Sequence, residues 1–277
     1  MELNLLSKNK SFNGTQMVYS HYSEACSCDM TFGLFMPDIS ERKEIPILWF
    51  LSGLTCNHEN AMTKAGAQQW ASETGLAVVF PDTSPRGEDV PNHSDFDLGQ
   101  GAGFYLDATN ATWSKNFNME TYIQSELTDL LFRNFNLNKS LQGITGHSMG
   151  GLGALNFALK NPNLFKSVSA FAPIANPMQS DWGRKQFAAY LGEDETSWVN
   201  YDPSLLLKER GFRTKILIDQ GKDDNFWDLL MPASLSQQFD SKKNGEFRYH
   251  NGYDHSYFFV STFIKDHIEH HGNILLS

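Results

Sequence analysis

The stretch "GHSMGG", from Gly146 to Gly151, places Ser148 between two glycines at the spacing G-x-S-x-G. An apolar run typical of a strand precedes it, and a small, apolar run typical of a helix follows. At such a turn the serine backbone is forced towards unfavourable dihedral angles, and glycines on either side avoid Cβ clashes. The hydroxyl is then exposed beside the positive end of the helix, where it could act as a nucleophile. Ordinary turns also show this spacing, so the motif alone does not establish catalysis.

A serine nucleophile requires a base that accepts its proton and a carboxylate that orients the base. On a sheet of this kind the order along the chain is serine, acid, histidine. His255, in "GYDHSYFF", lies between the last predicted strand and the last predicted helix, so a loop could bring it to Ser148. Asp223 and Asp224 both lie in the loop after the preceding strand, and the pattern does not separate them. Asp219 ends that strand and could be a buried structural carboxylate.

Four other histidines follow Ser148 and are less suited to be the base. His250 lies within a predicted strand, and His267, His270 and His271 lie late in the final predicted helix. We expect these three helical side chains to be exposed to solvent, although His267 could also cap or pack against the fold.

Two backbone N–H groups are needed to stabilise the oxyanion that forms during acyl transfer. One donor is expected from Met149, the residue after the serine. The other is expected from the loop "LSGLTCNHEN", where Gly53 allows close backbone approach and the N–H of Leu54 would follow it.

Strand patterns and helix patterns alternate along the chain, which predicts an α/β fold with a mostly parallel central sheet flanked by helices. About eight strands are expected, the first two as an antiparallel pair: Met17–Ser23, Cys28–Met36, Ile47–Leu51, Ala77–Phe80, Leu141–Thr145, Ser167–Phe171, Ile216–Asp219 and Glu246–His250. Helices are expected at Glu59–Ser72, Met119–Arg133 with Asn118 as a cap, Met149–Leu159, Phe226–Phe239 and Ser256–His270. No linker or repeat divides residues 1–277, so one domain is expected.

The composition excludes several classes of protein. The chain has 277 residues, of which 40% are hydrophobic, so a large buried core is expected. The net charge of −10 argues against binding to nucleic acid or to anionic membrane surfaces, which requires basic patches. No signal-like or membrane-spanning segment is visible, and three cysteines, an odd number, favour reduced thiols in a cytoplasmic protein.

The chain resembles the S-formylglutathione hydrolases, the esterase D family of α/β-hydrolases. The resemblance extends in order from about residue 50 to residue 264, and it is carried by "LSGLTCNHEN", "FPDTSPRGEDV", "DLGQGAGFYLDAT", "GHSMGGLGAL", "SAFAPIANP", "WGRKQFAAYLG", "IDQGKDDNF" and "GYDHSYFFVSTFI". It implies an α/β-hydrolase fold and a serine thioesterase that converts S-formylglutathione to glutathione and formate, the second step of glutathione-dependent formaldehyde detoxification. Members also cleave short acyl esters.

The resemblance also implies roles for individual residues. The family uses the second aspartate of "GKDD", which selects Asp224, and its serine and histidine correspond to Ser148 and His255. The family's cysteine in "SGLTC" lies close to the active site, which places Cys56 there. No metal or organic cofactor is implied, and members are generally cytoplasmic and form homo-oligomers, such as dimers or tetramers.

The sequence also offers candidates for the walls of the substrate pocket. Trp182 and Tyr257 are candidate pocket residues, although aromatic side chains are more often part of a core. The peptide of glutathione carries carboxylates, so Arg86, Lys115 and Arg184 are candidate contacts, although such a residue is more often an ordinary surface charge or a structural ion pair.

The alternatives are a general short-chain carboxylesterase with another natural substrate and a non-catalytic binding module with the same fold.

Overall fold

The computed structural model describes residues 2–39, 44–240 and 243–277. These residues form a nine-stranded sheet with the strand order β1-β2-β3-β5-β4-β6-β7-β8-β9. The strands are β1 (Asn4–Lys10), β2 (Gly14–Ser23), β3 (Cys28–Pro37), β4 (Ile45–Leu51), β5 (Ala77–Pro81), β6 (Leu137–Gly146), β7 (Phe165–Phe171), β8 (Ile216–Gly221) and β9 (Gly245–His250).

The sheet is parallel from β5 to β9 and antiparallel at its N-terminal end. β2 and β3 pair antiparallel as predicted, and β3 also pairs antiparallel with β5. The central strands β4 and β5 are buried along their whole length between two layers of helices, which explains their continuous apolar sequences. Each of the eight predicted strands is present, and β1 is an addition. It was not predicted because it is an edge strand, almost all of it exposed, and lacks the alternation of a half-buried strand.

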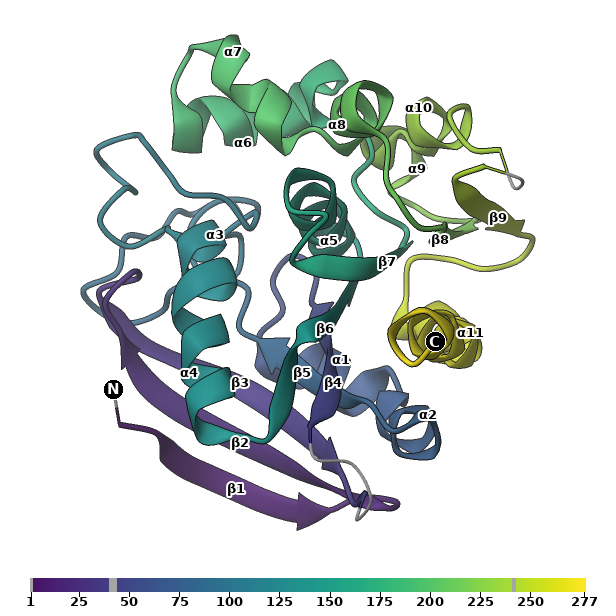
Figure 1. The fold of residues 1–277 in the computed structure, drawn as a ribbon. Coiled ribbons are helices and arrows are strands. Elements are labelled where there is room, and N and C mark those ends of the chain that lie inside the picture. Colours follow the sequence, from purple (N-terminus) through teal and green to yellow (C-terminus); the bar gives the residue numbers. More distant parts are fainter. Residues whose placement is uncertain (1, 40–43, 241–242) are drawn as a thin grey trace.

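Helices cover both faces of the sheet (Figure 1). They are α1 (His58–Lys64), α2 (Ala67–Thr74), α3 (Met119–Thr121), the π-helical η1 (Tyr122–Leu127), α4 (Thr128–Asn134), α5 (Met149–Lys160), the 3₁₀ turns η2 (Pro177–Gln179) and η3 (Val199–Tyr201), α6 (Asp181–Leu191), α7 (Glu195–Trp198), α8 (Pro203–Arg210), α9 (Trp227–Leu230), α10 (Pro232–Ser236) and α11 (Tyr257–Leu275). α1, α2 and α11 pack together on one face, whereas α4 and α5 pack on the other.

Three predicted helices are interrupted. The helix expected at Glu59–Ser72 is two helices, because Gly66 between them has a φ of 71°. The helix expected at Phe226–Phe239 is divided at Met231, which has a φ of 54° and precedes Pro232. In each case one residue in the left-handed region ends the first helix, and the hydrophobic pattern continues across the break.

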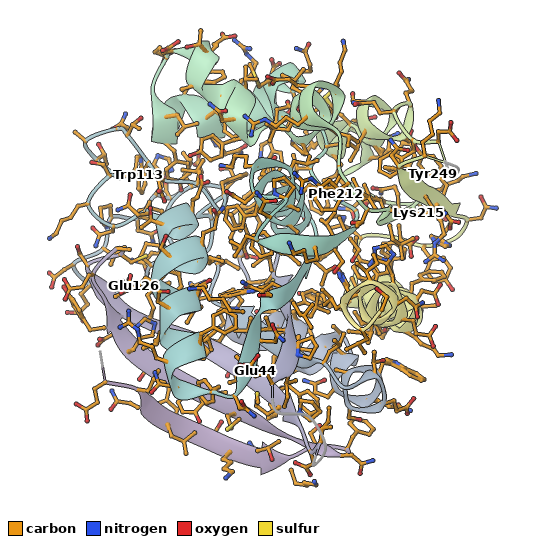
Figure 2. All side chains as sticks on the ribbon, in the orientation of Figure 1. Glu44, Trp113, Glu126, Phe212, Lys215 and Tyr249 are labelled. Carbon is orange, nitrogen blue, oxygen red and sulfur yellow. The ribbon has the colours of Figure 1, made fainter. Side chains whose placement is uncertain are left out.

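The predicted helix at Met119–Arg133 contains the π-helical turn η1. Glu126 in this turn is labelled in Figure 2 and accepts hydrogen bonds from Ser23 Oγ at 2.7 Å and from the N–H groups of Glu24 and Ala25 at 2.9 and 3.0 Å. Through Glu126, the π-helical turn therefore holds the connection between β2 and β3 in place by hydrogen bonds. Asn118 precedes the helix as predicted but does not cap it, because its side chain donates to Ala25 and Ser114.

The segment from η2 to α8 had no predicted helices and forms a helical layer beside α5, at the top of Figure 1. Ser180 caps α6 through the N–H of Gly183, and the buried Asp202 caps α8 through two backbone N–H groups. Ser180 and Asp202 are therefore local capping signals in the sequence for the starts of these two helices.

The histidines of α11 are less exposed than expected: His270 is half-buried, His267 packs in the core, which was the alternative for it, and His271 is buried as well. His267 and His271 are fully buried, because α11 packs against β7. Ser169 Oγ lies 2.8 Å from His267 Nδ1 and 2.9 Å from His271 Nε2. Asp219 accepts two 2.6 Å hydrogen bonds from Arg248 and lies 3.2 Å from His267 Nε2. The polarity of these side chains did not predict their burial, because they form hydrogen bonds with one another inside the core.

Asp219 is therefore a buried structural carboxylate. Burial alone would raise its pKa, but the hydrogen bonds from His267 and Arg248 outweigh burial and hold the pKa below the ordinary range. Because the folded-state pKa is depressed, the ionised carboxylate stabilises the fold above the unfolded-state value of about 4, and this stability is lost as the pH falls.

We expect Asp219→Asn to lower the free energy of unfolding by about 3–5 kcal/mol, because it leaves Arg248 without its buried partner. Asp266→Asn is the control, since Asp266 also binds Arg248 but its side chain is 46% exposed. That substitution should cost less than about 1 kcal/mol. Urea unfolding at neutral pH measures the free energy of unfolding of both variants. Equal losses would contradict the role of Asp219 as the buried partner of Arg248.

Candidate active site

Ser148 lies in the sharp turn between β6 and α5 and has a φ of 60° and a ψ of −119°. A non-glycine residue in this region is strained and persists only where its surroundings impose it. Two hydrogen bonds contribute here: the N–H of Ser148 donates to Phe171 O at 2.9 Å, and the N–H of Leu152 donates to Ser148 O at 3.1 Å. The strand-to-helix turn inferred from "GHSMGG" is therefore present.

The flanking glycines are required by close backbone contacts. A Cβ atom on Gly146 would lie 2.2 Å from Gly150 O, and one on Gly150 would lie 2.0 Å from Leu51 O. Both distances are far below van der Waals contact, and the obstacles are backbone atoms that cannot rotate away. The spacing G-x-S-x-G is thus explained by the approach of α5 to β4 and β6.

His255 and Asp224 are hydrogen-bonded to each other at 2.6 Å, from Nδ1 to Oδ2. Asp224 is buried and also accepts hydrogen bonds from Gln220 Nε2 at 3.0 Å and from the N–H of Phe226 at 2.8 Å. Asp223, the alternative that the sequence left open, is exposed. Because Nδ1 of His255 is engaged by Asp224, Nε2 is the nitrogen left to face a nucleophile.

Ser148 and His255 line one cavity of about 420 Å³. The cavity is also lined by Leu54, Cys56, Trp182 and Tyr257, so these candidates are brought together from the loop after β4, from α6 and from α11. Met149 and Asp224 are buried beside it and do not line it.

The N–H groups of Leu54 and Met149 have no acceptor among the residues that the structure describes. Their neighbours are engaged: the N–H of Thr55 donates to Gly101 O at 2.9 Å, and that of Gly150 donates to His147 O at 2.8 Å. Two free donors next to Gly53 and Ser148 are what an oxyanion site needs.

Cys56 is half-buried in the cavity wall near Tyr257. Burial raises the pKa of its thiol, and the nearby Lys64 charge only partly opposes this effect. Cys56 is therefore a protonated thiol at neutral pH, and weakly nucleophilic. Burial also raises the pKa of Tyr257, whose hydroxyl is kept neutral. All three cysteines of the chain are free thiols.

His147 belongs to the site and was missed in the sequence, although it precedes Ser148 in the same motif. Its ring lies 4.5 Å from that of His255 between centroids, and the ring of Phe226 lies 4.9 Å from His255. Burial, and then the charge of His255, hold the pKa of His147 well below its ordinary value. A neutral His147 therefore supports the His255 ring without adding an opposing charge.

Within residues 2–39, 44–240 and 243–277, no group of three or more histidine, cysteine or acidic side chains is arranged to hold a metal ion. No helix in these ranges is both long and apolar enough to cross a membrane.

Comparison with known proteins places this chain in one family. Residues 23–270 match the model of the Esterase family, described as "Putative esterase". The chain is 55% identical over 271 residues to an S-formylglutathione hydrolase of Paracoccus denitrificans (strain Pd 1222), with 98% of this chain and 97% of the relative covered. Among solved structures, an S-formylglutathione hydrolase from Agrobacterium tumefaciens superposes with a TM-score of 0.94 at 45% identity, covering 98% of this chain and 99% of that one.

A more distant structure, the fluorophosphonate-binding serine hydrolase FphF of Staphylococcus aureus, has a TM-score of 0.70 at 22% identity, covers 94% of this chain and 99% of that one, and supports the fold alone. The molecule has the α/β-hydrolase fold of the esterases. The chain belongs to the esterase family, and it is most extensively similar, among these relatives, to S-formylglutathione hydrolases.

We expect Gly150→Ala to lower the free energy of unfolding by about 3 kcal/mol or more, because the new methyl group meets a backbone oxygen. Gly272→Ala is the control, since its Cβ would meet only Thr74 Cγ2, at 2.3 Å, and a side chain can rotate away. Thermal unfolding of both variants measures the difference. A Gly150→Ala protein as stable as the control would show that the close approach of α5 to β4 is not needed.

Proposed function

We propose that this chain hydrolyses S-formylglutathione to glutathione and formate, through a formyl ester on Ser148. The observation that carries the proposal is the strained Ser148 in one cavity with His255, whose ring is held by Asp224 at 2.6 Å. The 55% identity to a protein named for this activity supports the choice of substrate. Short acyl esters would be cleaved in the same way.

In the acylation step, Ser148 Oγ attacks the formyl carbon while His255 Nε2 accepts the hydroxyl proton. The carbonyl oxygen becomes negatively charged and accepts hydrogen bonds from the N–H groups of Leu54 and Met149, the two free donors. The carbon–sulfur bond then breaks, and the imidazolium of His255 gives its proton to the sulfur. Free glutathione leaves, and the formyl group remains on Ser148.

In the deacylation step, His255 accepts a proton from a water molecule, whose oxygen attacks the formyl ester. The second tetrahedral intermediate uses the same two N–H donors. Its collapse releases formate and returns the proton to Ser148 Oγ. Asp224 keeps the His255 tautomer with Nδ1 protonated and stabilises the imidazolium in both steps. No metal or organic cofactor enters this scheme.

The wider properties follow the resemblance and are part of the proposal. We infer that residues 1–277 act as a single domain, that the enzyme works in the cytoplasm, and that it forms a homo-oligomer, either a dimer or a tetramer. A general short-chain carboxylesterase with another natural substrate is the alternative for the same site, and a non-catalytic binding module is the alternative without chemistry.

The decisive experiment compares kcat/KM for S-formylglutathione and for p-nitrophenyl acetate, with Ser148→Ala as the control. We expect the thioester to be the better substrate and Ser148→Ala to lower both rates by at least about 10⁴-fold. A strong preference for the aryl ester would favour the general carboxylesterase. Activity that survives in Ser148→Ala would remove the serine from the mechanism.

The two neighbouring aspartates provide a further prediction. Asp224→Asn should lower kcat for p-nitrophenyl acetate about 10⁴-fold, because the amide cannot hold the required tautomer or stabilise the imidazolium. Asp223→Asn should change kcat by less than about twofold, since Asp223 is exposed and the carboxylate that binds His255 is that of Asp224. Steady-state kinetics measure kcat for the two variants. If the two losses of kcat were equal, or larger for Asp223→Asn, Asp224 would not be the carboxylate that orients His255.

A further inference from the structure

The cavity that contains Ser148 has an unusual charge for this molecule. Among the described residues that line it, Lys64 is the single lysine or arginine, and none is an aspartate or a glutamate. The chain as a whole has a net charge of −10. Lys64 is therefore a single positive charge at the cavity of an acidic protein, and such a charge attracts an anion.

Lys64 and Asn60 both belong to α1 and both line the cavity. Residues four apart lie on the same face of a helix, so their side chains point in one direction. The buried Met62 lies on the opposite face, which fixes the rotation of α1. The start of α1 is also fixed, because Asn57 caps it and donates its own N–H to Asn60 Oδ1 at 3.0 Å.

The polar atoms of this pair are free to bind a ligand. Because Asn60 Oδ1 accepts the cap hydrogen bond, the Nδ2 group is left with two N–H donors. Lys64 is exposed, and its ammonium group forms no ion pair or hydrogen bond with any residue that the structure describes. Lys64 lines the same cavity as Cys56, so its side chain is available to a ligand bound there.

The other cations considered from the sequence are not suited to this role. Arg86 donates to Asp82 and to Cys56 O, so its guanidinium is part of the loop structure. Arg184 is paired with Glu195 on the surface. Lys115 is exposed and does not line the cavity.

We infer that Lys64, together with the side-chain amide of Asn60, binds a carboxylate of the peptide thiol that leaves in the proposed reaction. The inference rests on the proposed function and adds the residues that distinguish an anionic thioester from a neutral ester. A carboxylate can accept from the ammonium group and the amide at once, and charge-assisted hydrogen bonds of this kind are strong.

The contact is remote from the reacting carbon, so it acts equally on the ground state and on the transition state. It therefore lowers KM for the thioester and leaves kcat nearly unchanged. A neutral ester such as p-nitrophenyl acetate has no carboxylate and gains nothing from the contact. The effect must also weaken at high ionic strength, because the site is open to solvent.

The test measures kcat and KM for both substrates in Lys64→Met, which removes the charge and keeps a long side chain in the helix. We expect KM for S-formylglutathione to rise about tenfold, with kcat and the kinetics of p-nitrophenyl acetate unchanged within about twofold. Lys64→Arg should retain most of the affinity. Lys115→Met, which removes an exposed lysine outside the cavity, should leave both substrates unaffected.

Asn60→Asp tests the second donor, since a carboxylate oxygen can still accept the cap hydrogen bond from Asn57 while the amide donors are lost. KM for S-formylglutathione should again rise at least tenfold. The inference is overturned if KM for the thioester does not change in Lys64→Met, or if the two substrates lose activity equally, which would indicate a structural role or an effect on the oxyanion.

Product inhibition separates this inference from the proposed function. Glutathione should inhibit the hydrolysis of p-nitrophenyl acetate competitively, with an inhibition constant about tenfold weaker in Lys64→Met, whereas glutathione dimethyl ester should inhibit both forms equally weakly. If the unmodified protein binds glutathione in this way but does not hydrolyse S-formylglutathione, the proposed function fails and the binding site stands. If it hydrolyses the thioester and Lys64→Met shows neither the KM nor the inhibition effect, only the binding site fails.

Discussion

The strained backbone of Ser148 is the constraint on which the active site depends. An isolated chain would avoid a φ of 60° and a ψ of −119° at a serine, so neighbouring elements must impose them. Phe171 in β7 accepts the N–H of Ser148, and Leu51 in β4 accepts that of His147. Gly150 allows α5 to approach Leu51 more closely than any residue with a Cβ could. The hydroxyl is positioned by this packing, and its own side chain contributes little to it.

The buried polar network behind the sheet supports the same turn. His267 stacks on Phe171 with ring centroids 3.7 Å apart, and the carbonyl of Phe171 holds Ser148. His267 in turn is fixed by Ser169 and Asp219, and Asp219 is fixed by Arg248. These polar groups do not line the cavity and have no part in the chemistry, but they rigidify β7, whose Phe171 carbonyl accepts the N–H of Ser148.

The cavity separates the tasks of catalysis and recognition. At its catalytic end the Asp224 carboxylate is buried behind His255, burial keeps His147 neutral, and Cys56 and Tyr257 remain protonated. The single fixed cation among the described lining residues, Lys64, lies on α1 and would face the part of a substrate that leaves. An ammonium group on this separate helix can select an anionic substrate while the imidazole of His255 remains free to titrate during the reaction.

The order of strands and helices, the turn at Ser148 and the histidine of the last loop were accessible from the sequence, because hydrophobic periodicity and glycine spacing are local properties. The choice between Asp223 and Asp224 was open on local grounds and needed either a family resemblance or the fold, since adjacent residues differ in which one faces His255. The buried histidines of α11, the stacking of His147 and the unpaired Lys64 in the cavity could not be predicted. Each depends on which distant elements pack against it, and burial, partner and charge environment exist only once the tertiary structure has formed.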